Sequence, residues 1–215
     1  MVHRAASPRV PLPARLGVLL SGRGSNFEAL AAACDDGRVP ATIAIVLSDV
    51  SGAPGLDRAR ERGIPAVALP RKDFSSREAH EMAIDGALRG AGVDLVCLAG
   101  YMRLLSPSFV ALRPFGILNI HPSLLPAFPG LEPQAQALRH GVKLSGATVH
   151  FVTEGVDEGP IVAQEAVPVE PGDDAGALAA RILAVEHRLY PQAVAFVLRG
   201  GFEVRGRAVR PLNRG

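Results

Sequence analysis

The segment from Leu16 to Asn26 is Leu-Gly-Val-Leu-Leu-Ser-Gly-Arg-Gly-Ser-Asn, and it largely decides the fold. Its first five residues, ending at Leu20, form an apolar run of the length expected for a buried strand. Two glycines and small polar residues follow, and the segment from Phe27 to Cys34 then has the apolar spacing of a helix. A buried strand, a tight turn and a helix in this order predict a layered α/β domain.

The same alternation continues along the first half of the chain. Short β-branched runs predict further strands, and Ala/Leu/Arg-rich segments between them predict helices. Because strands that alternate with helices pair in parallel, this half resembles a Rossmann-type unit. The predicted strands are 42–47, 67–69 and 94–99, and the predicted helices are 56–62 and 77–89.

The alternation of strands and helices changes after Gly100. Strands are predicted at 116–121, 147–152 and 161–169, a short helix at 133–140, and a last helix from Asp173 or Asp174 to about Leu198. The turn from Glu154 to Pro160 is short enough for a hairpin, which requires antiparallel pairing. We therefore expect one α/β domain, Rossmann-like, with a mostly parallel sheet, antiparallel C-terminal strands and helices on both faces. We expect this domain to cover residues 15–204, with a flexible N-terminal tail at 1–14 and a C-terminal tail at 205–215.

Composition excludes several classes of function. The 215 residues carry a net charge of only +2, and the basic residues are scattered, so no surface for a nucleic-acid backbone is expected. Cys34 and Cys97 lie in apolar stretches, which favours buried free thiols and a reducing cytoplasm. Neither a signal peptide nor an apolar run of about 18 residues is present, so we expect neither export nor a membrane span.

The loop from Ser21 to Asn26 is a candidate phosphate site. Free backbone N–H groups and the helix dipole favour an anion where a glycine-rich turn opens a helix. The loop matches neither the dinucleotide fingerprint, because Phe27 stands where a third glycine belongs, nor a P-loop. Two alternatives stay open: a tight turn capped by Ser25 or Asn26, and a nicotinamide site in which Asp49 contacts a ribose.

Asn119 and His121 are the first candidate catalytic residues. They lie two residues apart on a predicted strand, so both project to one side at its carboxyl end. An amide and an imidazolium are suitable donors to an oxygen that gains negative charge when an amine attacks a carbonyl carbon. The alternative is an Asn and a His that bond only to neighbouring backbone.

Asp157 is the third candidate. If the turn folds back toward His121, its carboxylate orients the imidazole and raises the histidine's pKa. The alternative is a solvated acidic turn shared with Glu154 and Glu158. Neither a nucleophile elbow nor a histidine or cysteine spacing suited to a metal occurs, so we expect a metal-free reaction without a covalent acyl-enzyme. For His150 and His187 the pattern predicts only structural roles.

Several ordered motifs resemble the glycinamide ribonucleotide formyltransferase family. The matching segments extend from Leu16 to about Pro191 and are 24–26, 74–78, 98–107, 118–126, 149–153 with Asp157, and Glu186-His187. The resemblance implies a formyltransferase fold and transfer of the formyl group of 10-formyltetrahydrofolate to the amine of glycinamide ribonucleotide, in purine biosynthesis. It makes Asn119, His121 and Asp157 catalytic, with Asp157 holding His121 charged.

The resemblance also implies two substrate sites. The ribotide would contact Gly24, Ser25, Asn26 and Glu186. The folate site would comprise Arg77, Met102, Arg103, Leu104, Leu105, Asn119, Thr153, Glu154, Gly155, Val156 and Asp157. Both substrates are small molecules, and no metal, nucleic acid or membrane is implied. The chain would act as a monomer or a homodimer in the cytoplasm.

The chain departs from the family in one loop. Leu131-Glu132-Pro133-Gln134 stands where many relatives carry histidine, so no ligand contact is carried over there. Leu183 is also apolar where a polar residue occurs in the family. Four alternatives remain: a methionyl-tRNA formyltransferase, which would need a further basic domain; a formyltetrahydrofolate hydrolase, whose family form has an N-terminal regulatory domain; a non-catalytic folate or nucleotide-binding module; and a nicotinamide-dependent reductase.

Overall fold

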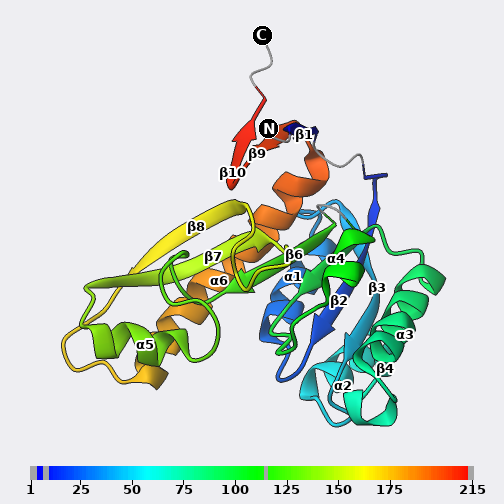
Figure 1. The fold of residues 1–215 in the computed structure, drawn as a ribbon, viewed down its shortest axis with the longest axis horizontal. Coiled ribbons are helices and arrows are strands. Elements are labelled where there is room, and N and C mark those ends of the chain that lie inside the picture. Colours follow the sequence, from blue (N-terminus) through cyan, green and yellow to red (C-terminus); the bar gives the residue numbers. More distant parts are fainter. Residues whose placement is uncertain (1–3, 7–9, 114–115, 213–215) are drawn as a thin grey trace.

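A computed structural model describes residues 4–6, 10–113 and 116–212. Its strands form one sheet in the order β1-β9-β10-β8-β7-β6-β5-β2-β3-β4 (Figure 1). The strands are β1 Arg4–Ala6, β2 Ala14–Leu20, β3 Ala41–Ser48, β4 Ala66–Ala68, β5 Leu95–Leu98, β6 Ile117–His121, β7 Leu144–Phe151, β8 Ile161–Pro168, β9 Phe202–Arg205 and β10 Ala208–Pro211.

Strand direction follows the prediction from the sequence. β4, β3, β2, β5 and β6 pair in parallel, and β6, β7 and β8 pair antiparallel. The chain leaves β2 toward β3 on one side and returns to place β5 on the other side. The loops that follow β2, β3, β5 and β6 therefore meet at one edge of the sheet, at the switch point where ligands bind in open α/β sheets.

Helices cover both faces of the sheet, as predicted. They are α1 Ser25–Asp35, α2 Pro54–Glu61, α3 Arg77–Gly90, α4 Pro107–Ala111, α5 Pro133–His140 and α6 Ala175–Arg199, with a 3-10 turn η1 at Arg71–Asp73. Phe27 of α1 and Tyr190 of α6 belong to one apolar core, and Leu88 of α3 and Phe109 of α4 to another. Two cores on opposite faces explain why the central strands are apolar along their whole length.

The segments predicted as tails contribute strands. β1, within the predicted N-terminal tail, pairs antiparallel with β9, and β9 pairs with β10, which lies within the predicted C-terminal tail. These strands have three or four residues, too few for a periodicity to be recognised in the sequence. Residues 4–6 of the predicted N-terminal tail are thus paired in the sheet, whereas residues 1–3, 7–9 and 213–215 lie outside the described part of the chain.

Candidate active site

Asn119, His121 and His150 meet between two adjacent strands. β6 carries Asn119 and His121, and β7 places His150 directly opposite Asn119 in the antiparallel register. The Asn119 amide nitrogen Nδ2 lies 3.1 Å from His150 Nε2. His121 and His150 are both buried. Strand alternation thus places Asn119 and His121 on one side of β6, and the register with β7 places His150 beside them.

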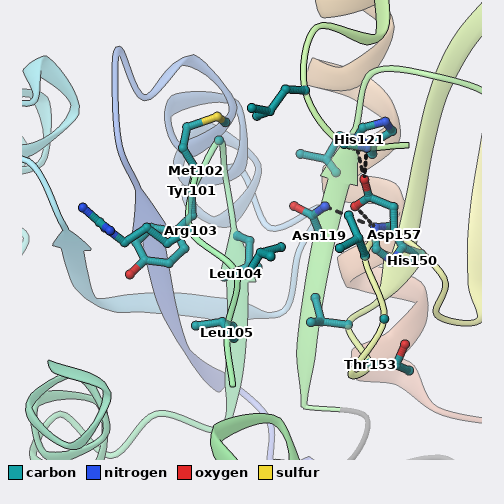
Figure 2. Close-up of a pocket in the computed structure, with 18 of the residues that line it drawn as sticks. Tyr101, Met102, Arg103, Leu104, Leu105, Asn119, His121, His150, Thr153 and Asp157 are labelled. Carbon is teal, nitrogen blue, oxygen red and sulfur yellow. Dashed lines mark hydrogen bonds and ion pairs between the residues drawn. The ribbon is translucent and has the colours of Figure 1, made fainter. Parts of the chain in front are cut away.

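Asp157 lies between the two imidazoles (Figure 2). Its Oδ2 is 3.3 Å from His121 Nδ1, and its Oδ1 is 3.5 Å from His150 Nε2. The backbone N–H of Gly130 donates to Oδ2 at 2.8 Å. The turn after β7 therefore folds back onto β6, as the sequence predicted, and the alternative of a solvated acidic turn does not hold for Asp157.

Each imidazole also bonds to a backbone carbonyl, which fixes where its proton lies. His121 Nε2 is 2.9 Å from the carbonyl oxygen of Phe128, and His150 Nδ1 is 3.0 Å from that of Phe151. Because a carbonyl oxygen only accepts, these two nitrogens carry protons. In a neutral His121 the other nitrogen then faces the Asp157 carboxylate with a lone pair, so only the imidazolium satisfies both neighbours of the ring.

Burial opposes that charge. It lowers the pKa of His121 below its usual value and outweighs the Phe128 carbonyl and the Asp157 charge, which both raise it. Asp157 therefore favours the charged ring, as expected from the sequence, but in the free protein the burial of the ring outweighs this effect. For Asp157, burial acts to raise the pKa, but bonds from His150 and the Gly130 N–H and the charge of His121 prevail and lower it.

The loops around these residues hold strained backbone. Phe128, Glu132 and Asp157 are the non-glycine residues with positive φ in the part of the chain that the structure describes, at 54°, 53° and 54°. The first supplies the carbonyl bound by His121, and the other two line the adjacent pocket. Such strain is typical of functional sites, where the surrounding structure fixes a side chain in one orientation.

A pocket of about 460 Å³ opens beside Asn119, His121 and Asp157. One wall is the segment 101–105 and the facing wall is 153–157 (Figure 2). Met102 and Leu104 are each 64% exposed, which provides apolar surface for a flat ligand, while Leu105 is buried in the core. Every residue predicted for the folate site lines this pocket: Arg77, Met102, Arg103, Leu104, Leu105, Asn119, Thr153, Glu154, Gly155, Val156 and Asp157.

The two arginines of the pocket bond to the protein itself. Arg77 Nη2 donates to the Leu104 carbonyl at 2.6 Å, and Arg103 Nε donates to Asp49 Oδ2 at 2.7 Å. Figure 2 shows the Arg103 side chain directed away from Asn119 and Asp157. In this conformation both arginines anchor the wall 101–105.

The loop after β2 leaves its backbone donors unused by side chains. α1 begins at Ser25, and Gly24 precedes it with φ 76° and no side-chain cap, so the alternative of a turn capped by Ser25 or Asn26 does not hold. A Cβ on Gly24 would lie 2.7 Å from the Cα of Gly55. Only glycine fits this turn, and the first N–H groups of the helix stay available to an anion.

Asn26 and Glu186 form a second buried polar pair. Asn26 Nδ2 donates to Glu186 Oε2 at 2.8 Å and so joins α1 to α6, while the Asn26 oxygen Oδ1 is buried without a partner. Burial raises the pKa of Glu186 to about 7, although the bond from Asn26 lowers it. The residues predicted for the ribotide lie outside the lining of the pocket beside Asn119: Gly24, Ser25, Asn26 and Glu186.

His150 is the residue that the sequence did not identify. Its contacts with Asn119 and Asp157 depend on the register between β6 and β7, which periodicity alone does not give. The available signal for His150 was a polar side chain inside the apolar strand 144–151.

Within residues 4–6, 10–113 and 116–212 no cluster of three or more His, Cys, Asp or Glu side chains could hold a metal ion. Of the predicted buried thiols, Cys97 is buried and Cys34 partly so, and both are free.

Comparison with known proteins decides the family. A family model described as "Formyl transferase" matches residues 14–194. The chain belongs to the formyl transferase family. It is 41% identical over 191 residues to phosphoribosylglycinamide formyltransferase of Escherichia coli, covering 89% of this chain and 90% of that protein. It superimposes with a TM-score of 0.91 on glycinamide ribonucleotide transformylase 1 from Symbiobacterium toebii, at 53% identity, covering 93% of this chain and 94% of that one.

A longer relative is similar over the same region. The chain is 48% identical over 188 residues to the trifunctional purine biosynthetic protein adenosine-3 of Drosophila melanogaster, which covers 86% of this chain. The chain spans only 14% of the length of that relative. No helix in the described residues is long and apolar enough to cross a membrane.

Proposed function

We propose that this chain transfers the formyl group of 10-formyltetrahydrofolate to the amine of glycinamide ribonucleotide, a step of purine biosynthesis. The observation that carries the proposal is the contact of His121 with Asp157 beside Asn119, at the wall of a pocket suited to a flat ligand. The family, and relatives named for this reaction over nearly their whole length, support the same activity.

The site suits direct attack of an amine on the formyl carbon. As the nitrogen attacks, the C=O bond becomes a C–O⁻ single bond. The Asn119 amide is a donor for that oxygen, and the His121 Nε2–H becomes a second donor when it turns from the Phe128 carbonyl to the oxyanion. The tetrahedral intermediate then collapses, the bond to the folate nitrogen breaks, and the amine holds the formyl group. No covalent bond to the protein forms, and the protein's contribution is orientation and charge stabilisation.

The protonation state of His121 fits this order of reaction steps. His121 is neutral in the free protein near neutral pH because burial lowers its pKa. An oxyanion that develops beside the ring adds to the charge of Asp157 and favours the imidazolium. His121 therefore takes up a proton released by the attacking amine and returns it to the departing folate nitrogen, while Asp157 stabilises the charged ring throughout.

The two substrates occupy two separate surfaces in this proposal. The pterin lies between the walls 101–105 and 153–157, and the ribotide phosphate lies on the N–H groups of the loop at Gly24, Ser25 and Asn26. Glu186 contacts the ribotide. No metal takes part, the reaction is cytoplasmic, and the chain acts as a monomer or homodimer.

Offering the formyl donor with different acceptors tests the proposal. Purified protein is incubated with 10-formyltetrahydrofolate and either glycinamide ribonucleotide, water alone or NADPH, while folate absorbance and products are followed. We expect tetrahydrofolate and formylated ribotide only when the ribotide is present. Formate release at a similar rate without it would indicate a hydrolase, NADPH oxidation a reductase, and no turnover a binding module.

A further inference from the structure

Asp49 is a buried carboxylate that the proposed reaction does not use. It follows β3 at the edge of the sheet where the substrate loops meet, and its side chain is only 6% exposed. The Ser21 hydroxyl donates to Asp49 Oδ1 at 2.5 Å, and Arg103 Nε donates to Oδ2 at 2.7 Å. Both oxygens have a partner within the protein, which disfavours the alternative that Asp49 contacts a cofactor ribose.

These bonds join two loops that belong to different substrate sites. Ser21 is the first residue of the loop that leads to Gly24 and α1, and Arg103 is part of the wall 101–105. Ser21 is tied to the second loop twice more: its N–H donates to the Gly100 carbonyl at 3.0 Å, and its hydroxyl accepts from the N–H of Met102 at 2.9 Å. The hydroxyl thus donates its proton to Asp49 and accepts from Met102 with a lone pair.

We propose that Asp49 is a positioning residue that couples the two substrate sites, so that a ligand on the loop 21–26 and a ligand against the wall 101–105 strengthen each other's binding. The inference rests on the proposed function for the identity of the two ligands. An anion on the N–H groups at Gly24, Ser25 and Asn26 restricts the loop that begins at Ser21. Through Asp49 and the Met102 N–H this fixes the wall, so the second ligand orders less of the protein when it binds.

The two hydrogen bonds that Asp49 accepts, from Ser21 and Arg103, determine which substitution disrupts this bridge between the loops. Both partners of Asp49 donate a hydrogen bond, so a side chain with two acceptor oxygens is required. Asp49→Asn keeps the size but removes the charge that pairs with Arg103 and replaces one acceptor by a donor. The ion pair is therefore lost, and the Ser21 hydroxyl no longer donates to a charged acceptor in the geometry that the carboxylate gives it. Asp57→Asn is the control for loss of a carboxylate paired with an arginine, because Asp57 pairs with Arg60 on the exposed surface of α2.

Binding without turnover isolates the coupling. Tetrahydrofolate lacks the formyl group, so its affinity can be measured by calorimetry with and without saturating glycinamide ribonucleotide. In the wild type and in Asp57→Asn we expect the ribotide to tighten tetrahydrofolate binding at least about 5-fold. The reciprocal experiment must give the same factor. In Asp49→Asn we expect the factor to fall to about 1, with KM for the formyl donor raised more than kcat is lowered.

Defined outcomes overturn the inference. Independent binding of the two ligands in the wild type, or full coupling in Asp49→Asn, would show that Asp49 only stabilises the loops. Thermal unfolding reports whether Asp49→Asn folds; if it does not, Ser21→Ala, which removes one arm of the bridge, must weaken the coupling in the same assay, and unchanged coupling there also refutes the inference. The proposed function is tested separately by formyl transfer in the wild-type sample, because coupling can be measured whether or not transfer occurs.

Discussion

Asp157 and Glu186 are two largely buried carboxylates of one domain, yet their pKa values move in opposite directions. Asp157 faces two imidazoles and accepts from the Gly130 N–H, and its pKa falls below the usual value. Glu186 has one bond, from the neutral amide of Asn26, and burial raises its pKa to about 7. Burial therefore acts to raise the pKa of both carboxylates, and their hydrogen-bonding and charged partners decide the direction of the net shift.

The opposite pKa shifts suit the two carboxyl groups to different roles. Asp157 stays ionised at neutral pH and is suited to hold a histidine that gains and loses a proton. Glu186 exchanges its own proton near neutrality, and in its protonated form it can donate to the Asn26 oxygen that otherwise lacks a partner.

The largest effect is expected at His121, the partner of Asp157. His121→Ala removes the oxyanion donor and the proton carrier together, so kcat should fall by at least about 100-fold. Ligand affinities should change little, since Asn119 and the pocket walls remain. Steady-state kinetics with both substrates varied measure this, and turnover close to wild type would remove His121 from the mechanism.

Asp157→Asn should have the next largest effect. Loss of the charge removes an interaction that raises the pKa of His121, so NMR titration should show a pKa below the already lowered wild-type value. The imidazolium is then harder to form, and kcat should fall by at least about 30-fold with smaller changes in KM. An unshifted His121 titration together with wild-type kcat would leave Asn119 and His121 as the whole catalytic set.

Glu186→Gln should change how stability depends on pH. A raised pKa means that the stabilising protonated form is fully present below the unfolded value near 4.5 and is lost as the pH rises through about 7. Gln does not titrate and has no such loss. Between pH 4 and pH 8 the free energy of unfolding of Glu186→Gln should therefore rise, relative to that of the wild type, by on the order of 2 kcal/mol. Denaturant unfolding at the two pH values measures this, and parallel curves for both proteins would mean that Glu186 is charged in the fold.

Metal removal should have the smallest effect. The described residues contain no cluster that could hold an ion, and the mechanism assigns charge stabilisation to Asn119 and His121. Exhaustive dialysis against EDTA should therefore leave kcat unchanged. Loss of activity that Zn²⁺ or Mg²⁺ restores would show that a metal shares this role.

The sequence predicted the fold because its signals are local. Apolar strand runs, the glycine turn at Gly24 and the cap at Asp174 all act within a few residues. Alternation along one strand likewise put Asn119 and His121 on one face. For Asp157 the residues left two alternatives open, and the family resemblance implied the contact with His121 that the structure contains.

Features that depend on distant pairing were missed. His150 belongs to the site through the register of β6 with β7, and β1 through its pairing with β9. α4 was also missed, since its five residues from Pro107 to Ala111 are too few for a helical period. Asp157 raises the pKa of His121 as predicted, but the larger opposite effect of burial was not visible in the sequence.

The formyl carbon itself gives the most direct test of the central claim. With 10-formyltetrahydrofolate labelled with ¹³C at that carbon, NMR follows the label in a reaction with glycinamide ribonucleotide. We predict that the wild-type protein places the label on the ribotide nitrogen, and that His121→Ala does so at least about 100-fold more slowly. Label recovered as formate while the ribotide is present, or transfer by His121→Ala at the wild-type rate, would contradict the account.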